Sequence, residues 1–464
     1  MLESLKNIFS IPDLRKRVIF TFLMMAVYRI GGHIPVPGIN FQALESFFRQ
    51  QGGGILGFLD LFSGGNLRRL TIFALGIMPY ISASIILQLL TVIWPYLEKL
   101  SKEGEVGRRK ITQYTRYGTV VLSIIQSLGI AFWLESLTGA GAEGGVVPSP
   151  GWSFRLMTVL TLTTGTAFIM WVGEQISERG IGNGISLIIY AGIVSGLPSA
   201  VATLWQDVTT GTLGAITLVV LLVMMVAVVA AIVWVERAQR KIPVQYARRV
   251  VGRRMYGGMQ THMPLRLNTG GVIPVIFASS VLAFPLTFMQ WLGVQDKAWL
   301  AEIYRQLDYS MPLHNLLYLL AIVFFCYFYI SIIFNPMDVA DNMKKYGGFI
   351  PGIRPGRRTA EFLDEILTRL TFVGAIYLGL ISLLPQILIS GLNVQALPGI
   401  GPTLDEYLPV FLTQGLGLKF FFGGTSLLIV VGVAMDTVQQ VESQLIMRHY
   451  DGFLKGARIR GRRG

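Results

Sequence analysis

The sequence predicts an all-α polytopic membrane protein with ten transmembrane helices. Of its 464 residues, 52% are hydrophobic and only 14% are charged, whereas a soluble domain carries about 25% charged residues. The chain also contains nine clear runs without any charged residue and a tenth, weaker one, which is typical of bilayer spans. In addition, Lys and Arg gather in alternate loops, as they do in polytopic membrane proteins.

The spans follow from the charge-free runs, because a charge at the bilayer centre costs several kcal/mol. The first and weakest is Val18–Tyr28, which continues past Arg29 to Pro35. The other nine are Leu70–Leu97, Tyr117–Leu134, Leu156–Gly173, Gly180–Gln206, Val208–Val235, Leu267–Gln295, Tyr309–Met337, Leu370–Leu404 and Phe420–Met435. We expect the helix that starts at Leu370 to end near Pro385, since proline interrupts helices.

The positive-inside rule orients these spans. With the N-terminus in the cytoplasm, 31 of the 39 Lys and Arg residues fall on the cytoplasmic side and eight on the other. We therefore expect both termini in the cytoplasm. The formal net charge of +13 then belongs to a basic cytoplasmic face, which includes the long loops Glu236–Leu267 and Asp338–Arg369. Ten spans also divide five and five around the first of these loops, which would suit an inverted repeat.

One outer segment, between the first and second spans, departs from a plain helix bundle. Its octet Ile55–Phe62, which is apolar apart from Asp60, is bordered by glycines on both sides. Eight residues are too few to cross a bilayer, and the glycines supply conformational freedom at both ends. We interpret the segment as a short re-entrant helix, which must be buried in protein or line a cavity.

The composition argues against catalysis. The single cysteine, Cys326, excludes an intrachain disulfide framework and a cysteine-based metal site, and four scattered histidines offer no cluster. We expect no catalytic residues, no metal and no cofactor.

A secondary transporter is the serious alternative, but coupling to protons or sodium normally needs ionisable groups near the midplane. Arg29 is the one exception within the predicted spans, and it lies toward the outer end of the first. The remaining interpretation is a gated passive pore driven by cytoplasmic partners.

Specific strings point to a family. Their order along nearly the whole chain resembles the SecY family of protein-translocation channels, in its bacterial branch. These strings are Leu75-Gly-Ile-Met-Pro-Tyr-Ile-Ser-Ala-Ser-Ile85, the stretches 103–117 and 173–185, Gly271-Val-Ile-Pro274, Phe349-Ile-Pro-Gly-Ile-Arg-Pro-Gly356 and Gly423-Gly-Thr-Ser-Leu-Leu-Ile429.

The resemblance implies ten helices in two pseudo-symmetric five-helix halves, 1–205 and 206–464, around an hourglass pore. Such a channel passes unfolded secretory polypeptides outward and releases apolar segments sideways into lipid. It implies the bacterial plasma membrane as location, and SecE-like and SecG-like subunits in a heterotrimer. It also implies the SecA ATPase, the ribosome, signal peptides and nascent chains as partners, with transport driven by SecA, by ribosomal elongation or by the proton-motive force.

The family's pore constriction is a ring of bulky aliphatic residues. The positions that match it here are Ile77, Ile81, Ile185, Ile189, Ile276 and Ile429. A narrow apolar ring loses its water and blocks ions, yet it forms no strong bond to a passing chain. Without the resemblance, isoleucines four residues apart would be read as ordinary helix packing.

The outer segment resembles the family's plug, here residues 55–69, which fills the outer funnel at rest. Its expected plug residues are Ile55, Phe58, Leu59, Leu61, Phe62 and Arg69. The alternative is a static surface loop. The resemblance also implies a lateral gate between spans two and three on one side and seven and eight on the other. Its matching residues are Ser82, Gln88, Gln126 and Phe284.

The two long cytoplasmic loops resemble the family's docking sites for SecA and the ribosome. The expected contact residues are Arg354, Arg357, Arg248, Arg249, Arg253 and Arg254. Arg354 matches the arginine on which the family's motor depends, and ribosomal RNA phosphates are suitable partners for such clusters. The alternative is that these charges merely set the topology. A second rival for the whole chain is a membrane scaffold that only recruits ribosomes, which would leave the isoleucines and the plug without a purpose.

Overall fold

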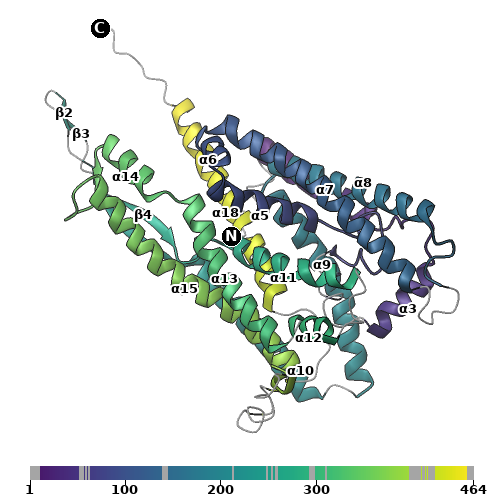
Figure 1. Cartoon of the computed structure of the whole chain (residues 1–464). Helices are drawn as coiled ribbons and strands as arrows, with labels where there is room; N and C mark the ends of the chain where they lie inside the picture. The colour runs from purple at the N-terminus through teal and green to yellow at the C-terminus, as the bar shows by residue number, and fades with distance from the viewer. Residues whose placement is uncertain are drawn as a thin grey trace. The chain divides into compact units, whose positions relative to one another are not determined.

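The computed structural model describes most of the chain. The described residues are 11–51, 57, 60, 63–137, 145–211, 214–246, 249–251, 254–256, 260–291, 298–308, 311–396, 409, 413, 415 and 424–456. Helices dominate them (Figure 1). The helices are α2 (Pro12–Gly31), α3 (Phe41–Gln51), α5 (Met78–Ile93), α6 (Pro95–Lys102), α7 (Glu105–Leu137), α8 (Trp152–Arg179), α9 (Gly184–Thr209), α10 (Ala215–Arg237), α11 (Ile273–Trp291), α12 (Ala298–Leu307), α13 (Pro312–Ile333), α14 (Pro336–Lys345), α15 (Arg357–Ser390), the 3-10 helix η2 (Val394–Ala396) and α18 (Gly424–Gly456).

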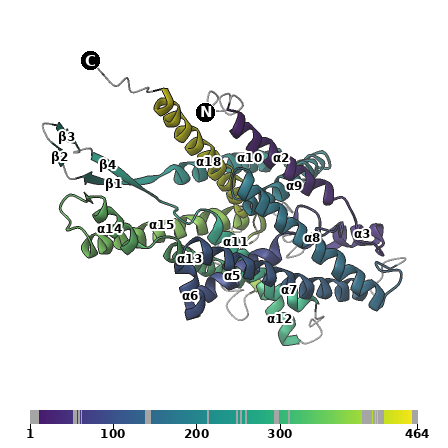
Figure 2. The same ribbon diagram turned by 90° about the horizontal axis from the view of Figure 1, so that it is seen from above.

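Each predicted span overlaps one of these helices, namely α2, α5, α7, α8, α9, α10, α11, α13, α15 and α18. Within the described part of the chain, seven helices are long and apolar enough to cross a membrane, and an eighth is added if the bent pair α5 and α6 forms one span. The expected helical membrane architecture is confirmed, while the number ten stays a prediction. Helices α7 and α8 lie side by side in both views (Figures 1 and 2).

The second span is shorter than its charge-free run. The run begins at Leu70, but α5 begins at Met78, because Gly76 takes a φ of 57° and Pro79 occupies the first helical turn. A left-handed residue cannot belong to an α-helix, and proline favours a helix start. At the other end Trp94 is extended ahead of Pro95, and α6 leaves at 98° to α5.

The ninth span corrects an expectation. Helix α15 does not end near Pro385 but continues to Ser390. A proline inside a helix removes the donor to the carbonyl four residues earlier, here that of Ile381. Gly424 of α18 lies against both, since a Cβ built on it would sit 2.1 Å from the Ile381 oxygen and 2.9 Å from the Pro385 ring. The neighbouring helix thus packs tightly against the interrupted stretch.

The sequence analysis did not predict the small sheet in the two long basic loops. Strand β1 (Gln239–Tyr246) pairs antiparallel with β4 (Gln260–Arg266), and β5 (Gly348–Phe349) from the second loop pairs with the other edge of β1. A two-stranded extension of β2 (Arg249–Val251) and β3 (Arg254–Tyr256) stands at the hairpin's tip (Figure 2). The two loops therefore share one sheet, in the order β4-β1-β5.

The chain separates into two compact units. Unit 1 comprises Met1–Thr203, Ala283–Ala301 and Val433–Gly464, and unit 2 comprises Leu204–Leu282 and Glu302–Gly432. The division at residue 205 that the resemblance implies stays a prediction. In unit 1 an apolar core joins α3, the segment 67–75, the end of α7 and the start of α8.

In unit 2 a separate core lies beneath the sheet. It is built from Ile242, Leu265, Ile350, Leu363, Ile366 and Leu367. These residues come from β1, β4, the segment after β5 and the first turns of α15. The loops are therefore folded on a core of their own.

We expect Leu363→Ala to loosen this loop core. Leu363 is fully buried, and removing such a side chain costs about 2–5 kcal/mol. A thiol-reactive dye can follow unfolding, because the chain's single cysteine, Cys326, is buried. The midpoint of heat-induced labelling should fall by several degrees. Met337→Ala on α14, where Met337 is exposed, should leave it nearly unchanged, and equal midpoints for both variants would contradict the core assignment.

Candidate functional site

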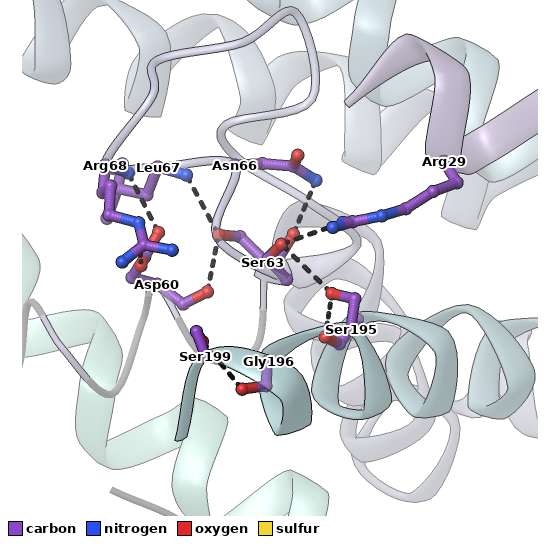
Figure 3. A network of polar contacts seen from close by, with 11 residues as sticks. Arg29, Asp60, Ser63, Asn66, Leu67, Arg68, Ser195, Gly196 and Ser199 are labelled. Atoms are coloured by element: carbon purple, nitrogen blue, oxygen red, sulfur yellow. Dashed lines mark hydrogen bonds and ion pairs between the residues drawn. The ribbon is translucent and has the colours of Figure 1, made fainter. Parts of the chain in front are cut away.

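The most tightly held irregular segment of unit 1 is the turn that follows the predicted plug octet. It runs from Ser63 through Gly64 and Gly65 to Asn66 and packs between α2 and α9 (Figure 3). Ser63, Gly64 and Asn66 are buried. Ser63 is the last helical residue before residues 64–66, which are not helical, so the Ser63 and Gly64 carbonyls need donors from elsewhere.

Side chains from two helices and from the turn itself supply these donors. The Ser63 carbonyl accepts hydrogen bonds from the Tyr28 hydroxyl at 3.2 Å and from Asn66 Nδ2 at 2.6 Å. The Gly64 carbonyl accepts from Arg29 Nη1 at 3.2 Å and from Ser195 Oγ at 3.3 Å. We call these donors, Tyr28, Arg29, Asn66 and Ser195, the plug anchor. Arg29, the one charge within the predicted spans, therefore has a structural partner.

A second set of contacts holds the turn to Asp60. Asp60 Oδ1 accepts from the Arg68 N–H at 2.9 Å, and its other oxygen lies 3.7 Å from Arg68 Nε. The Ser63 hydroxyl donates to the Asp60 carbonyl at 3.0 Å and accepts from the Leu67 N–H at 3.1 Å. Burial raises the pKa of Asp60, and the Arg68 N–H and guanidinium oppose that rise. Asp60 and the segment 63–68 thus form one hydrogen-bonded unit.

Gly64 is required at its position for two reasons. Its φ is +73°, in the left-handed region that favours glycine. A Cβ built on it would also lie 2.8 Å from the Gly192 Cα of α9, closer than packed atoms tolerate. Gly65 shares the first reason, with φ +80°, but a Cβ there would meet only the end of the Arg68 side chain, at 3.5 Å. Of the two glycines, only Gly64 therefore brings the backbone of the turn into contact with the backbone of α9.

Most of the predicted plug residues lie outside the described residues, namely Ile55, Phe58, Leu59, Leu61 and Phe62. Arg69 is described and half-buried, directly after Arg68. The structure accordingly shows how the C-terminal side of the plug segment is attached, and the plug assignment itself stays a prediction.

The predicted ring isoleucines lie on helices of both units. Ile77 and Ile81 stand at the start of α5, and the Ile81 N–H donates to the Ile77 carbonyl at 3.1 Å. Ile185 and Ile189 lie on α9, Ile276 on α11 and Ile429 on α18. All six except the half-buried Ile185 are buried. Their common role as a ring is not tested by the geometry within either unit.

The predicted gate residues have mixed environments. Ser82 and Gln88 on α5 are half-buried, and Gln88 Nε2 donates to Ser84 Oγ at 3.0 Å. Gln126 on α7 is buried, whereas Phe284 on α11 is 39% exposed. Their joint role as a gate stays a prediction.

The predicted docking arginines lie in the two loops that share the sheet. Arg354 is exposed in the turn between Gly352 and Gly356, both at positive φ, and its carbonyl accepts from the Thr359 hydroxyl at 2.9 Å. Arg357, also exposed, pairs with Glu361 at 3.1 Å. The backbones of Arg249 and Arg254 belong to β2 and β3, while Arg248 and Arg253 lie outside the described residues.

Sequence reasoning missed most of the plug anchor. It noted Arg29 as an unusual charge. Tyr28 and Ser195 carried no signal, because polar residues in spans are more often helix–helix contacts, and Asn66 lies between two predicted spans, where a polar residue is ordinary. Across the described part of the chain, no three His, Cys, Asp or Glu side chains gather closely enough to hold a metal ion.

Comparison with known proteins identifies the family. The SecY family model matches residues 71–438. The chain is 48% identical over 453 residues to the protein translocase subunit SecY of Escherichia coli K12, covering 97% of this chain and 96% of that one. It is 44% identical over 456 residues to the SecY subunit of Aquifex aeolicus, covering 98% and 100%.

Solved structures share the fold at lower identity. One described as "The structure of a protein conducting channel" aligns with a TM-score of 0.65 at 17% identity, over 96% of this chain and 95% of that one. A SecY structure reported with the finding that its plug domain stabilises the closed state aligns at 0.63 and 18% identity, with the same coverage. The Sec61 channel of a canine ribosome complex aligns at 0.61 and 16% identity, again with that coverage. With a match across most of its length and similar relatives over nearly all of it, this chain belongs to the SecY family.

Proposed function

We propose that this multi-pass membrane protein is a protein-conducting channel, which passes unfolded secretory polypeptides across the membrane and releases apolar segments laterally into lipid. Its main support is the full-length similarity to bacterial translocase subunits. In this function the chain conducts its substrate and does not itself catalyse a reaction. The bacterial relatives favour the plasma membrane as its location, with both termini in the cytoplasm.

The observation that carries the gating proposal is the plug anchor. A short outer segment ends in a turn whose carbonyls are held by α2 and α9. Hydrogen bonds of ordinary length can hold such a segment at rest and still be broken, because each is worth only about 0.5–1.5 kcal/mol net, or about twice that with a charged donor. The isoleucines would seal what the plug leaves open.

The partners we propose follow from the same family. SecA or the ribosome would dock on the sheet-bearing loops and drive transport, and SecE-like and SecG-like subunits would complete the complex. Relatives bound to ribosomes include the canine Sec61 channel and the yeast Ssh1 complex. Ribosomal RNA phosphates would meet the arginines of β2, β3 and the Arg354 turn.

The channel is tested by deleting Ile55–Arg69 and measuring single-channel ion conductance in planar bilayers. The wild-type protein should be almost closed, and the deletion should open often and flicker, because the remaining apolar ring seals imperfectly. A deletion that conducts no more than the wild type would remove the plug assignment.

The plug anchor is tested by a matched pair of glycine variants. Gly64→Ala and Gly65→Ala introduce the same backbone strain, but only Gly64→Ala forces a Cβ against α9. Such overpacking adds about 1–3 kcal/mol. We expect the resting conductance of Gly64→Ala to exceed that of Gly65→Ala by roughly 5- to 150-fold. Equal leaks in the two variants would mean that the contact with α9 does not hold the plug.

The docking turn is tested by two charge reversals. Arg354→Glu should lower SecA-dependent export into membrane vesicles by roughly tenfold or more, if the guanidinium meets an acidic group of the partner. Arg358→Glu is the control, because Arg358 is also exposed but already faces Glu361 at 3.8 Å. Its effect should stay below about threefold, as for most exposed ion pairs. Similar losses from both reversals would indicate a general charge effect and not a specific contact.

A further inference from the structure

The junction between α10 and α11 in unit 2 contains a buried carboxylate. Glu236 is the second-last residue of α10 and is 6% exposed. A buried carboxylate is expensive unless hydrogen bonds compensate its lost hydration. Asn268 supplies one such bond, since its Nδ2 donates to Glu236 Oε1 at 2.7 Å, and Asn268 is itself 4% exposed.

The same amide also reaches the start of α11. Asn268 Nδ2 donates to the Gly271 carbonyl at 3.1 Å, and Gly271 turns the chain with φ +59° two residues before α11 begins. One amide group therefore connects the end of α10 with the turn that enters α11, across the whole β1–β4 hairpin.

Two other helices enclose this turn. On α15, a Cβ built on Gly374 would lie 3.0 Å from the Leu267 carbonyl and 3.7 Å from the Asn268 Cα. On α18, a Cβ built on Gly432 would lie 2.3 Å from Val272 Cγ1. Residues 267–272 thus pack against the bare Cα of a glycine on α15 and of another on α18, so a shift of the turn toward either helix would cause overlap.

The turn is directly connected to a predicted ring residue. The Ile276 N–H donates to the Val272 carbonyl at 3.2 Å and forms the first turn of α11. On the other side, the Leu267 N–H donates to the Ala238 carbonyl at 3.0 Å, at the base of the hairpin. Residues 267–272, which include Asn268, are therefore hydrogen-bonded to the base of the hairpin at one end and to Ile276 at the other.

We propose that Asn268 is a positioning residue, whose amide holds the start of α11 against Glu236 and thereby sets the place of Ile276. The effect of Asn268 on a pore rests on the proposed channel function. Its effect on the position of α11 does not depend on that function. We call the contacts of Asn268 with Glu236 and Gly271 the joint. Docking of a partner on the β1–β4 hairpin would change the position of Ile276 through this joint.

A disulfide between positions 272 and 432 measures the position directly. The Val272 Cβ and a Cβ built on Gly432 are 3.7 Å apart, close to the mean of about 3.8 Å in disulfides. The background is the full-length protein with Cys326→Ala, Val272→Cys and Gly432→Cys. Its oxidation rate reports whether the start of α11 stays against α18.

Three changes are then added to this background. Asn268→Asp keeps the shape but sets a second carboxylate against Glu236, and Glu236→Gln keeps an acceptor for the asparagine amide. The double variant restores a hydrogen bond between positions 236 and 268, because the amide introduced by Glu236→Gln can donate to the carboxylate introduced by Asn268→Asp. It leaves the Gly271 carbonyl without the donor that Asn268 supplies. We expect Asn268→Asp to slow disulfide formation by roughly tenfold, the size of a lost charge-assisted bond. Glu236→Gln alone should change the rate little, and the double variant should recover part of the loss.

Asn268→Ala is a second test that introduces no repulsion, and gel filtration verifies that each variant remains folded. Slower cross-linking in both Asn268 variants with partial recovery in the double variant supports the proposal. Unchanged cross-linking in both, or a double variant as slow as Asn268→Asp alone, overturns it. Conductance measured on the same variants without the cysteine pair reports separately on the channel, so a failure of the proposed function would not be mistaken for a failure of the joint.

Discussion

The constraint on which this structure depends is that a buried carbonyl without a helical partner must find a donor elsewhere in the protein. The turn 63–66, within the proposed plug segment, meets this constraint with side chains from α2, from α9 and from the turn itself. The Ser63 and Gly64 carbonyls are bonded to side-chain donors and not to a helical ladder, so the turn is held by bonds that are individually weak. Such bonds suit the proposed plug, which would stay in place at rest and still be released.

Glycine allows a helix to pack closely against backbone carbonyls that lie outside regular helical bonding. At Gly165 on α8 and Gly424 on α18, a Cβ would lie 1.9 Å from the Ile72 oxygen and 2.1 Å from the Ile381 oxygen. Both carbonyls lie where regular helical bonding is interrupted, in the turns before α5 and ahead of Pro385. Glycine here is needed for its missing side chain, because only a bare Cα lets one segment approach another's carbonyl oxygen so closely. Any larger residue would separate the helix from the interrupted stretch.

Much of the helical architecture was predictable, because burying a charge in lipid is costly and membrane spans therefore appear in the sequence as runs without charged residues. Every charge-free run overlaps a helix, and the misplaced ends have local causes in Gly76, Pro79 and Pro95. The expected end near Pro385 was wrong because a neighbouring glycine accommodates the proline, which no local pattern reveals. The β1–β5 pairing joins residues about a hundred positions apart, and the plug anchor joins Gly64 to Ser195. Such contacts form between residues that are far apart in the sequence, so no local pattern reveals them. The resemblance to a family supplied candidate residues but not the side chains that contact them.

The proposed ring of isoleucines could not position itself. Aliphatic side chains have no directional bonds, which suits a constriction that must pass many different polypeptides without binding them. The precision must then come from polar groups outside the ring. On α11 the Asn268 amide with Glu236 and Gly271 lies just ahead of Ile276 in the chain, and on α9 Ser195 lies nearly two turns beyond Ile189, bonded to Gly64. Directional bonds outside the proposed constriction and their absence within it are therefore two parts of one arrangement, since a directional bond within the constriction would also hold the passing chain.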